Sequence, residues 1–478
     1  MVFLDRLMEM AAARPDALCV SADGRQADYH DIAARVGALA AQIAARRIGP
    51  GSVAVTRVAD PILDLVVMLA LLHEGVAQCS VTALGAAHID IAADLVVADA
   101  AALPDLQRAL SGVPCIAADG GFTPAPLQPK IADPGFVAQI LLTSGTTAAA
   151  KMVPLTRGAL VRRTAVRAGY FPSRGGCLCL MPIAAAGGLQ TCLSALDAGI
   201  RVDLSTNTDA QVASATDPGT RQIVGSPAQF LALMAALKAA GRTAPQITDI
   251  LLMGGDVTDA LIAAAQPMFG GPVVVLYGTT ELGACAAFGS NRDGRSGRLR
   301  LLPGVEAAAF ADDGTRLPDG ASGSLRFRAP GMAAGYYGNP ALTAECYVGG
   351  WFSPGDIGSV EDEEITLQGR RDEVINLAGI KYDPARIDHF IAAQGLATDA
   401  AAFRFVDPAG AEHMIIAAVV SDDASYDRLR AAIRQEIGAG QFPVGFFRVT
   451  AIPRTAMGKP LRSALADQML AVLARKPG

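Results

Sequence analysis

Residues 139–147 read Gln-Ile-Leu-Leu-Thr-Ser-Gly-Thr-Thr, and Lys151 follows four residues later. Residues 139–142 predict a buried strand, and the hydroxyl residues and glycine after it predict a loop rich in O–H and N–H donors. Such a concave set of donors suits phosphate oxygens, and Lys151 adds a positive charge. This is not a Walker A loop, since the GxxxxGKS/T pattern is absent. A hydroxyl-rich turn with a solvated lysine is the alternative.

Short apolar strands alternate with alanine-rich helices on both sides of this loop. Strands are predicted at 53–55, 95–97, 250–253 and 273–276, and helices at 62–72, 227–240 and 259–268. Apolar runs of this kind, separated by helices, are typical of layered α/β architecture with parallel strands buried on both faces.

The pattern changes after about Val305. Short strands punctuated by glycine and proline, such as 324–328 and 364–367, predict a β-rich subdomain. The last hundred or so residues hold a strand and a helix of their own, enough for a small domain. We therefore predict an α/β fold. Its large N-terminal domain, 1–371, has layered α/β subdomains plus the β-rich subdomain, and a small mobile α+β domain follows at 372–478.

Composition excludes several classes of protein. Hydrophobic residues make up 51% of the 478 residues and charged residues 18%, so the chain has ample apolar surface to fold. A net charge of −6 argues against nucleic acid or an anionic membrane as the main partner. The longest apolar stretch, 62–72, is shorter than the roughly 18 residues of a membrane span and contains Asp64. No signal peptide is recognised, and the eight cysteines form no CxxC pair, so a cytoplasmic location is expected.

Further motifs follow the 139–151 segment in a characteristic order. They are Tyr-Gly-Thr-Thr-Glu at 277–281, the stretch 323–336, Gly-Trp-Phe-Ser-Pro-Gly-Asp at 350–356, Gly-Arg-Arg-Asp at 369–372 with a glycine at 379, and Pro-Arg-Thr-Ala-Met-Gly-Lys at 453–459. Together these six segments resemble the motifs of the adenylate-forming superfamily, which includes acyl- and aryl-CoA synthetases, luciferase and the adenylation domains of peptide synthetases. The resemblance implies that a carboxylate attacks the α-phosphorus of ATP, giving acyl-AMP and pyrophosphate.

The resemblance also implies which residues act. The loop would hold the departing phosphates through Thr143, Ser144, Gly145, Thr146, Thr147 and Lys151. Thr280 would hydrogen-bond the α-phosphate, Glu281 would hold Mg²⁺, and Lys459 would bridge the carboxylate and the α-phosphate. These three are the predicted catalytic residues. The alternatives are a carboxylate at a helix start for Glu281 and a mobile surface lysine for Lys459.

The nucleoside would be held by a second set of residues. Tyr277 would stack on adenine, although a plain core tyrosine is the alternative. Asp356 would accept from both ribose hydroxyls, because a carboxylate is an acceptor-only group, and Arg370 would support the same ribose. The other predicted nucleotide contacts are Gly255, Gly278 and Thr279.

The acyl group would lie against small residues. The predicted substrate contacts are Ala185, Gly188, Gly254 and Gly283. Ala185 stands where the family usually has histidine or another aromatic residue, and small side chains predict room for an aromatic, bulky or medium-chain acid. Bulky residues from elsewhere in the fold that fill this space are the alternative. The phosphate loop also departs from the family, with Ala148, Ala150 and Met152 where glycine, proline and glycine are usual.

Asp372 matches the family's hinge, about which the small domain would rotate to admit a thiol. The leading hypothesis is a carboxylate–CoA ligase that uses ATP, Mg²⁺ and coenzyme A, because no long insertion of the fatty acyl-AMP ligase type lies near this hinge. An acyl-AMP ligase that loads an acyl carrier protein, and a non-catalytic nucleotide-binding relative, remain as alternatives.

Overall fold

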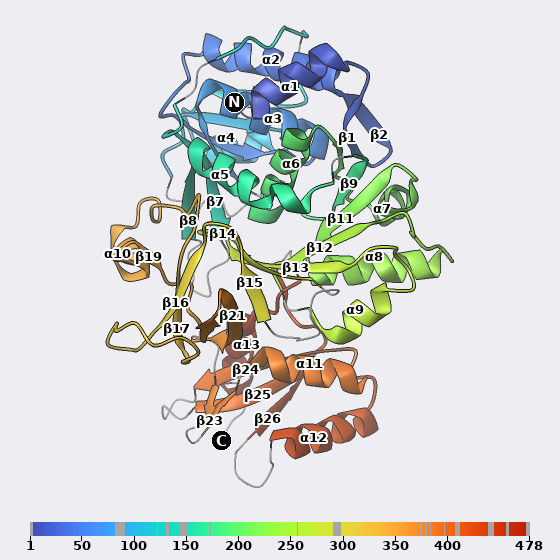
Figure 1. Cartoon of the computed structure of the whole chain (residues 1–478), viewed down its shortest axis with the longest axis vertical. Helices are drawn as coiled ribbons and strands as arrows, with labels where there is room; N and C mark the ends of the chain where they lie inside the picture. The colour runs from blue at the N-terminus through green and yellow to red at the C-terminus, as the bar shows by residue number, and fades with distance from the viewer. Residues whose placement is uncertain are drawn as a thin grey trace. The chain divides into compact units, whose positions relative to one another are not determined.

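The protein is described by a computed structural model, in which the chain divides into two compact units (Figure 1). The first comprises residues 1–306 and 327–352, and the second residues 307–326 and 353–478. The described residues are 3–81, 91–121, 123–130, 133–143, 151–172, 174–255, 257–289, 298–371, 375–377, 380–382, 384–395, 397–406, 412–437, 444–455 and 458–474. The predicted domain boundary at Asp372 lies outside them and stays a prediction.

A six-stranded sheet forms the N-terminal part of the first unit. Its order is β6 (Cys115–Ala117), β5 (Leu95–Ala98), β3 (Val53–Arg57), β4 (Ala77–Ser80), β7 (Val137–Thr143) and β8 (Lys151–Thr156). Every neighbouring pair is parallel except β7 and β8, which are antiparallel. The parallel strands are short apolar runs, as expected for strands covered on both faces.

A second sheet in this unit has a parallel centre. Its parallel strands, in order, are β1 (Leu18–Ala22), β10 (Arg201–Asp203), β9 (Gly176–Cys179), β11 (Thr220–Gly225), β12 (Asp249–Met253) and β13 (Val273–Thr279). Antiparallel strands extend it: β2 (Arg25–Asp28) beside β1, and β14 (Gly283–Gly289) then β15 (Arg298–Leu301) beyond β13. The predicted layered α/β class is confirmed.

Helices cover these sheets. The helices of the first unit are α1 (Phe3–Ala13), α2 (Tyr29–Ala45), α3 (Pro61–Glu74), α4 (Leu103–Ala109), α5 (Arg157–Arg167), α6 (Ala186–Ala198), α7 (Thr208–Thr216), α8 (Pro227–Ala239), α9 (Asp259–Ala265) and α10 (Pro340–Cys346), with a 3₁₀ turn at Ala168–Tyr170. Helix α3 contacts both β1 and β4, so it packs between the two sheets. This position explains why α3 is buried continuously from Asp64 to Glu74 and is apolar all round over residues 65–72.

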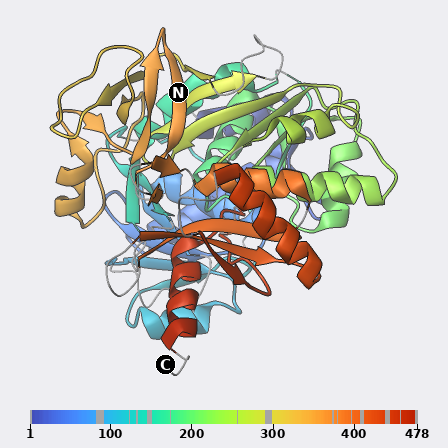
Figure 2. The same cartoon turned by 90° about the horizontal axis from the view of Figure 1, so that it is seen from below.

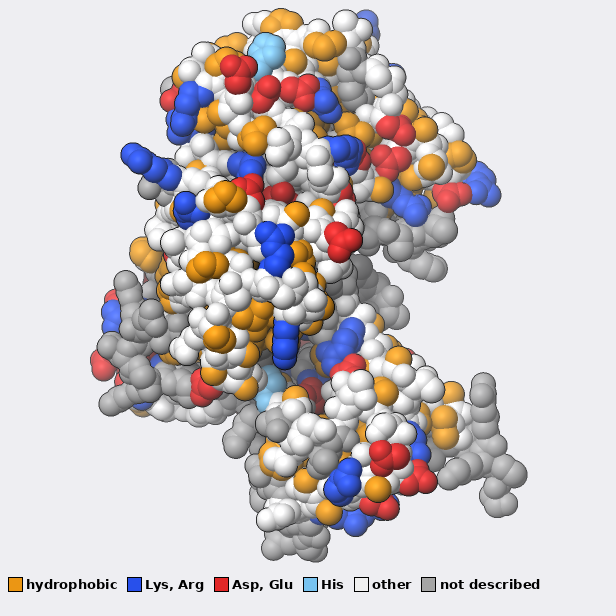
Figure 3. Space-filling view, turned by 90° about the vertical axis from the view of Figure 1, so that its right-hand side faces the viewer, with side chains coloured by type: hydrophobic (Ala, Val, Ile, Leu, Met, Phe, Trp, Pro, Cys, Tyr) orange, Lys and Arg blue, Asp and Glu red, His pale blue; other side chains and the backbone are white. Residues whose placement is uncertain are grey.

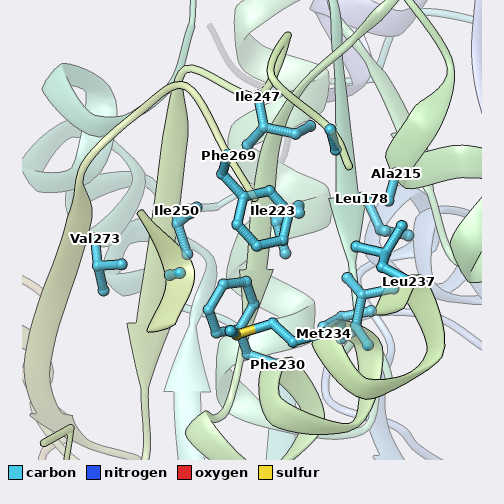
Figure 4. Packing of buried hydrophobic residues seen from close by; sticks show 14 of the residues in the cluster. Leu178, Ala215, Ile223, Phe230, Met234, Leu237, Ile247, Ile250, Phe269 and Val273 are labelled. Carbon is cyan, nitrogen blue, oxygen red and sulfur yellow. The ribbon is translucent and has the colours of Figure 1, made fainter. Parts of the chain in front are cut away.

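One core cluster packs α8 and α9 against the second sheet. The rings of Phe230 and Phe269 lie 5.3 Å apart in its centre, among Ile223 and Ile250 of the sheet (Figure 4). Helix α9 ends at Ala265, three residues before its predicted end. The reason is Pro267, because the residue before a proline is disfavoured in a helix.

Short antiparallel strands build the predicted β-rich region. They are β16 (Glu306–Phe310), β17 (Gly323–Arg328), β18 (Tyr347–Val348), β19 (Trp351–Phe352), β20 (Asp356–Glu361) and β21 (Glu364–Arg370), followed by the hairpin of β22 (Ile375–Leu377) and β23 (Ile380–Tyr382). Residues 362 and 363 have positive φ and form the tight turn between β20 and β21.

The C-terminal part of the second unit has an α+β architecture, a sheet with helices packed against it (Figure 2). Its sheet is β24 (Asp399–Val406), β25 (Glu412–Val419) and β26 (Val444–Arg448). Ala402 and Met414 face α11 (Pro384–Gln394) and α12 (Asp423–Ile437), while Phe403 and Ile415 pack with Leu465 of α13 (Arg462–Ala474). Alternate residues of each strand therefore face opposite helices, as the period of two requires.

Charged side chains of both signs lie on the surface of the described residues (Figure 3). On the face shown in Figure 3, basic and acidic side chains are interspersed. No helix among the described residues is long and apolar enough to cross a membrane. All eight cysteines are free thiols, and most of them are buried.

Asp64 is a buried polar side chain of α3, as are His73 and Glu74 at the end of this helix. Its side chain is 8% exposed, it interacts with Gln78, and its Oδ1 has no hydrogen-bond partner among the described residues. Burial, and then the nearby charge of Asp99, raises the pKa of Asp64 to about 7. The native state therefore holds a proton that the unfolded chain, with an ordinary aspartate pKa, releases above about pH 4.

This makes the stability contribution of Asp64 pH-dependent. Because its native pKa is raised, the free energy of unfolding falls as the pH rises from about 4 to about 7. Asp64→Asn removes the ionisation, so it should stabilise the protein by about 2–4 kcal/mol at pH 8 and by less at pH 5. Urea unfolding at the two pH values measures the difference, with Asp16→Asn at an exposed position as control. Equal effects at both pH values would contradict the assignment.

Candidate active site

The predicted phosphate loop joins two antiparallel strands. Strand β7 ends at Thr143 and β8 begins at Lys151, and these two residues are direct partners across the base of the loop. The predicted strand before the loop is confirmed. The strand that follows the loop, β8, pairs antiparallel with β7, so the two strands form a hairpin. Of the predicted phosphate contacts, Ser144, Gly145, Thr146 and Thr147 lie outside the described residues.

The Tyr277–Glu281 motif forms a second hairpin turn. Gly278 and Thr279 of β13 pair with Ala284 and Gly283 of β14, with a bulge after Tyr277. A Cβ on Gly278 would lie 2.0 Å from the carbonyl oxygen of Gly283, so only glycine allows the strands to approach this closely. The turn places Thr280 and Glu281 beyond the end of a parallel strand.

Glu281 is a buried carboxylate in this turn, 8% exposed, and it does not start a helix. The phenolic O–H of Tyr336 donates to its Oε1 at 2.8 Å. Among the described residues, no donor reaches its other oxygen, Oε2. The Tyr336 ring also lies under the Lys151 ammonium, with Nζ 5.6 Å from the ring centroid. Tyr336 thus connects the base of the phosphate loop to the carboxylate.

Arg163 of α5 fixes the backbone of the same turn. Its Nη1 donates to the carbonyl of Thr280 at 3.0 Å and its Nη2 to that of Glu281 at 2.7 Å. Its Nε donates to the carbonyl of Gly331 at 2.8 Å. Burial lowers the pKa of Arg163 to about 10, so the guanidinium stays charged at neutral pH. The buried charge is satisfied by carbonyl oxygens of two chain segments.

The sequence analysis did not identify Arg163. Helix α5 contains several arginines, and none stands in a recognised motif. A signal was nevertheless present, because Ala159, Arg163 and Arg167 follow the i, i+4, i+8 spacing of one helix face, and that face is buried. An arginine on the apolar face of a helix requires internal partners.

Tyr277 is half-exposed at the end of β13. Its ring packs beside Phe327, with centroids 5.7 Å apart. The nearby turn after β12 contains Gly254, whose φ of +80° is in the left-handed region that favours glycine. Gly255 follows it, and a Cβ there would contact the ring of Pro227 at 3.3 Å.

The glycines of the predicted acyl segment are closely packed. A Cβ on Gly188 would lie 2.0 Å from the carbonyl oxygen of Pro182, so this glycine permits a backbone contact. A Cβ on Gly187 would meet the side chain of Met181 at 2.3 Å and the sulfur of Met253 at 3.0 Å. Deformable methionine side chains, therefore, occupy the space beside Gly187.

Ala185 and Gly283 differ in their surroundings. Ala185 is half-buried at the N-cap of α6, and its N–H donates to the carbonyl of Pro182. Gly283 has a φ of +79°, and the guanidinium of Arg163 lies 3.1 Å from where its Cβ would be. The space beside Gly283 is therefore filled.

In the second unit, Asp356 and Arg370 are direct partners on β20 and β21. Asp356 is 8% exposed, and the Nε of Arg370 lies 4.0 Å from its Oδ1. The Nη2 of Arg370 also donates to the carbonyl of Pro354 at 2.9 Å. The structure thus brings the two predicted ribose contacts together.

Lys459 lies in a tight, exposed loop of the second unit. Its N–H donates to the hydroxyl of Thr455, and its carbonyl accepts from the N–H of Thr455 at 2.8 Å. Gly458 before it has a φ of +80°, and Arg454 donates to the Gly458 carbonyl while pairing with Asp399. The backbone that carries Lys459 is therefore held on both sides. The predicted hinge residue, Asp372, lies outside the described residues.

No cluster of three or more potential metal ligands occurs among the described residues. Mg²⁺ in nucleotide sites is commonly held by one or two carboxylates together with phosphates and water. The hard, anionic Oε2 of Glu281 fits that requirement, because only Oε1 is engaged by Tyr336.

Comparisons with known proteins identify the family. The model of the AMP-binding enzyme family matches residues 7–337. A 4-chlorobenzoate–CoA ligase from Arthrobacter sp. is 28% identical over 75% of this chain and 70% of its own length. Fatty acid–[acyl-carrier-protein] ligase MmaC from Mycobacterium marinum is 26% identical over 97% of both chains. Two longer fungal relatives, chalcone synthase cfoA of Aspergillus candidus and naringenin synthase of Pestalotiopsis fici, are matched over only 9% and 10% of their length.

The fold is also that of solved structures. The crystal structure of ATP-bound MatB from Rhodopseudomonas palustris superposes with a TM-score of 0.86 at 20% identity, over 99% of this chain and 100% of that one. At this identity the likeness establishes the fold. Taken with the family match over residues 7–337, it leads to one conclusion: this chain belongs to the AMP-binding enzyme family.

Proposed function

We propose that the chain is an ATP-dependent acid–thiol ligase that activates a carboxylic acid and transfers the acyl group to coenzyme A. In the first step, a carboxylate oxygen bonds to the α-phosphorus of ATP and pyrophosphate leaves. In the second, the sulfur of the thiol bonds to the acyl carbonyl and AMP leaves. The observation that carries the proposal is the buried carboxylate of Glu281, held by Tyr336 beside Lys151.

The described residues suit the first step. Two anions must approach one another, so positive charge and alignment dominate the barrier. Lys151 supplies a cation at the base of the phosphate loop, and the Glu281 carboxylate would hold Mg²⁺, which neutralises phosphate charge when bound. Arg163 fixes the carbonyls of Thr280 and Glu281, so the Thr280 side chain is presented from a rigid turn.

The nucleoside and the transferred group would involve the second unit. The buried carboxylate of Asp356 can accept from two ribose hydroxyls, with Arg370 beside it. Lys459 would donate to the carboxylate and the α-phosphate as charge develops. Because hydrogen bonds already hold the backbone of its loop, less conformational freedom would be lost when the Lys459 side chain binds these groups.

A carrier-protein thiol is the second candidate acceptor. It is favoured by one observation, the match of MmaC over 97% of both chains. Coenzyme A is favoured by the resemblance to 4-chlorobenzoate–CoA ligase and by the absence of a hinge insertion in the sequence. Both acceptors present the same phosphopantetheine thiol to the acyl-AMP.

Pyrophosphate release with ATP and a panel of acids tests the function. The purified chain is assayed without a thiol, with coenzyme A, and with a phosphopantetheine-loaded carrier protein. Stimulation and acyl-CoA formation with coenzyme A support the proposal, and acylation of the carrier alone supports the second candidate. No acid-dependent pyrophosphate release, with nucleotide binding retained, would indicate a non-catalytic relative. Glu281→Gln is the control for dependence on the carboxylate.

Lys459→Ala should separate the two half-reactions. Losing one charge-stabilising donor should slow acyl-AMP formation by about 10²–10³-fold. Reaction of supplied acyl-AMP with the thiol should be nearly normal, because the attack on the carbonyl does not use this lysine. Lys238→Ala, an exposed lysine at the end of α8, is the matched control. Equal losses in both half-reactions would refute this division of roles.

Asp372 is proposed as the hinge between the two half-reactions. Asp372→Pro restricts φ to about −65° and removes an N–H, so it should impair thioester formation and spare adenylation. Single-turnover assays of the two steps provide the measurement. Loss of adenylation with intact thioester formation would place the hinge elsewhere.

The acid is proposed to be aromatic, bulky or of medium chain length. Ala185 is half-buried at the start of α6, and the side chains of Met181 and Met253 beside Gly187 can rearrange around a large apolar group. Each methylene buried there would contribute about 0.8 kcal/mol. Acetate would gain little from such a surface.

Ala185→Phe should therefore discriminate by size. It should raise the KM of benzoate-sized or medium-chain acids about tenfold or more, the cost of excluding a few methylenes. The KM of ATP and activity towards acetate should stay unchanged, which serves as the internal control. A wild-type preference for acetate would contradict the proposed acid class.

A further inference from the structure

Tyr336 is held rigidly on the segment before α10. Its N–H donates to the hydroxyl of Thr343 at 2.9 Å, and its ring meets the ring of Tyr347 edge-on, with centroids 5.9 Å apart. A Cβ on Gly335 would lie 2.5 Å from the Thr343 side chain, so glycine there allows the two segments to approach. The side chain is only 7% exposed. Its phenolic oxygen and ring are therefore placed with little freedom.

The two halves of the Tyr336 side chain have different partners. The O–H donates to Oε1 of Glu281, and the face of the ring lies under the ammonium of Lys151. A tyrosine hydroxyl is protonated at neutral pH, so the Tyr336 O–H donates to the carboxylate. A carboxylate that accepts on one oxygen has its plane fixed and presents the other oxygen in a defined direction.

We infer that Tyr336 is a positioning residue for the metal–nucleotide complex, an inference that rests on the proposed function. Its hydroxyl holds Oε1 of Glu281, so that Oε2 would be available to the metal ion, and its ring holds the Lys151 ammonium by a cation–π contact. Groups that hydrogen-bond a ligating carboxylate typically affect metal affinity about 10–100-fold when removed. Tyr336 therefore links the two segments that would contact the phosphates. Tyr336 itself would not touch the reacting atoms.

The two contacts can be removed separately. Tyr336→Phe deletes the hydroxyl and keeps the ring over Lys151, whereas Tyr336→Leu deletes both. Tyr347→Phe is a matched control, because the Tyr347 hydroxyl has no hydrogen-bond partner among the described residues. Circular dichroism melting verifies that each variant is folded.

Binding of a non-hydrolysable ATP analogue is measured under two conditions. With Mn²⁺ present, the electron paramagnetic resonance signal of the metal reports binding. Without metal, in EDTA, calorimetry reports it. Tyr336→Phe should weaken binding of the Mn²⁺–analogue complex about tenfold and leave metal-free binding unchanged. Tyr336→Leu should weaken both, and Tyr347→Phe neither. In turnover assays, Tyr336→Phe should raise the Mg²⁺ concentration needed for half-maximal rate and spare the KM of the acid.

A double-mutant cycle with Glu281→Gln makes the inference independent of overall folding. If Tyr336 acts through Glu281, adding Tyr336→Phe to Glu281→Gln should cause no further loss of Mn²⁺–analogue binding. A wild-type protein that binds the complex and a Tyr336→Phe variant that binds it equally would overturn this inference alone. A wild-type protein that binds neither form of the nucleotide would overturn the proposed function as well.

Discussion

The buried guanidinium of Arg163 is the contact on which the candidate site depends. A charge removed from water is tolerated only when its donors are satisfied, and here they are satisfied by the carbonyls of Thr280, Glu281 and Gly331. Because no carboxylate pairs with it in these bonds, the arginine keeps its full charge directed at backbone oxygens. Losing either carbonyl segment would leave donors of the buried guanidinium unsatisfied, so Arg163 couples α5, the β13–β14 turn and the 331–336 segment into one rigid part.

This rigidity extends to Tyr336 through the short chain that follows Gly331. The N–H of Ala333 donates to the same Glu281 carbonyl that accepts from Arg163, at 2.8 Å. Glu281 is thus fixed at its backbone by Arg163 and Ala333 and at its side chain by Tyr336. A carboxylate held at both ends is preorganised, so little reorganisation is needed when charge is brought to it.

Both candidate phosphate-contacting turns occupy the same kind of place in their sheets. Each follows the last parallel strand, β7 in one sheet and β13 in the other, where an antiparallel neighbour begins. Side chains after the carboxyl ends of parallel strands gather at one edge, a common location of binding sites in α/β proteins. The switch to antiparallel pairing adds a tight turn, which Gly278 makes possible through its close contact with Gly283.

The alternation of strands and helices, the strand before the phosphate loop and the motif residues were predictable because they depend on local patterns. Strand and helix periods, proline and glycine positions and runs such as 277–281 act over a few residues. The partners of those residues were not predictable. Arg163 and Glu281 are 118 residues apart in sequence, and Tyr336 and Glu281 are 55 apart. The spaces beside Gly187 and Gly283 were likewise filled by Met181, Met253 and Arg163, which no local pattern indicates. The sequence by itself determined which chemical groups stand in turns, whereas the tertiary structure decided what holds them, because packing joins segments that the chain separates.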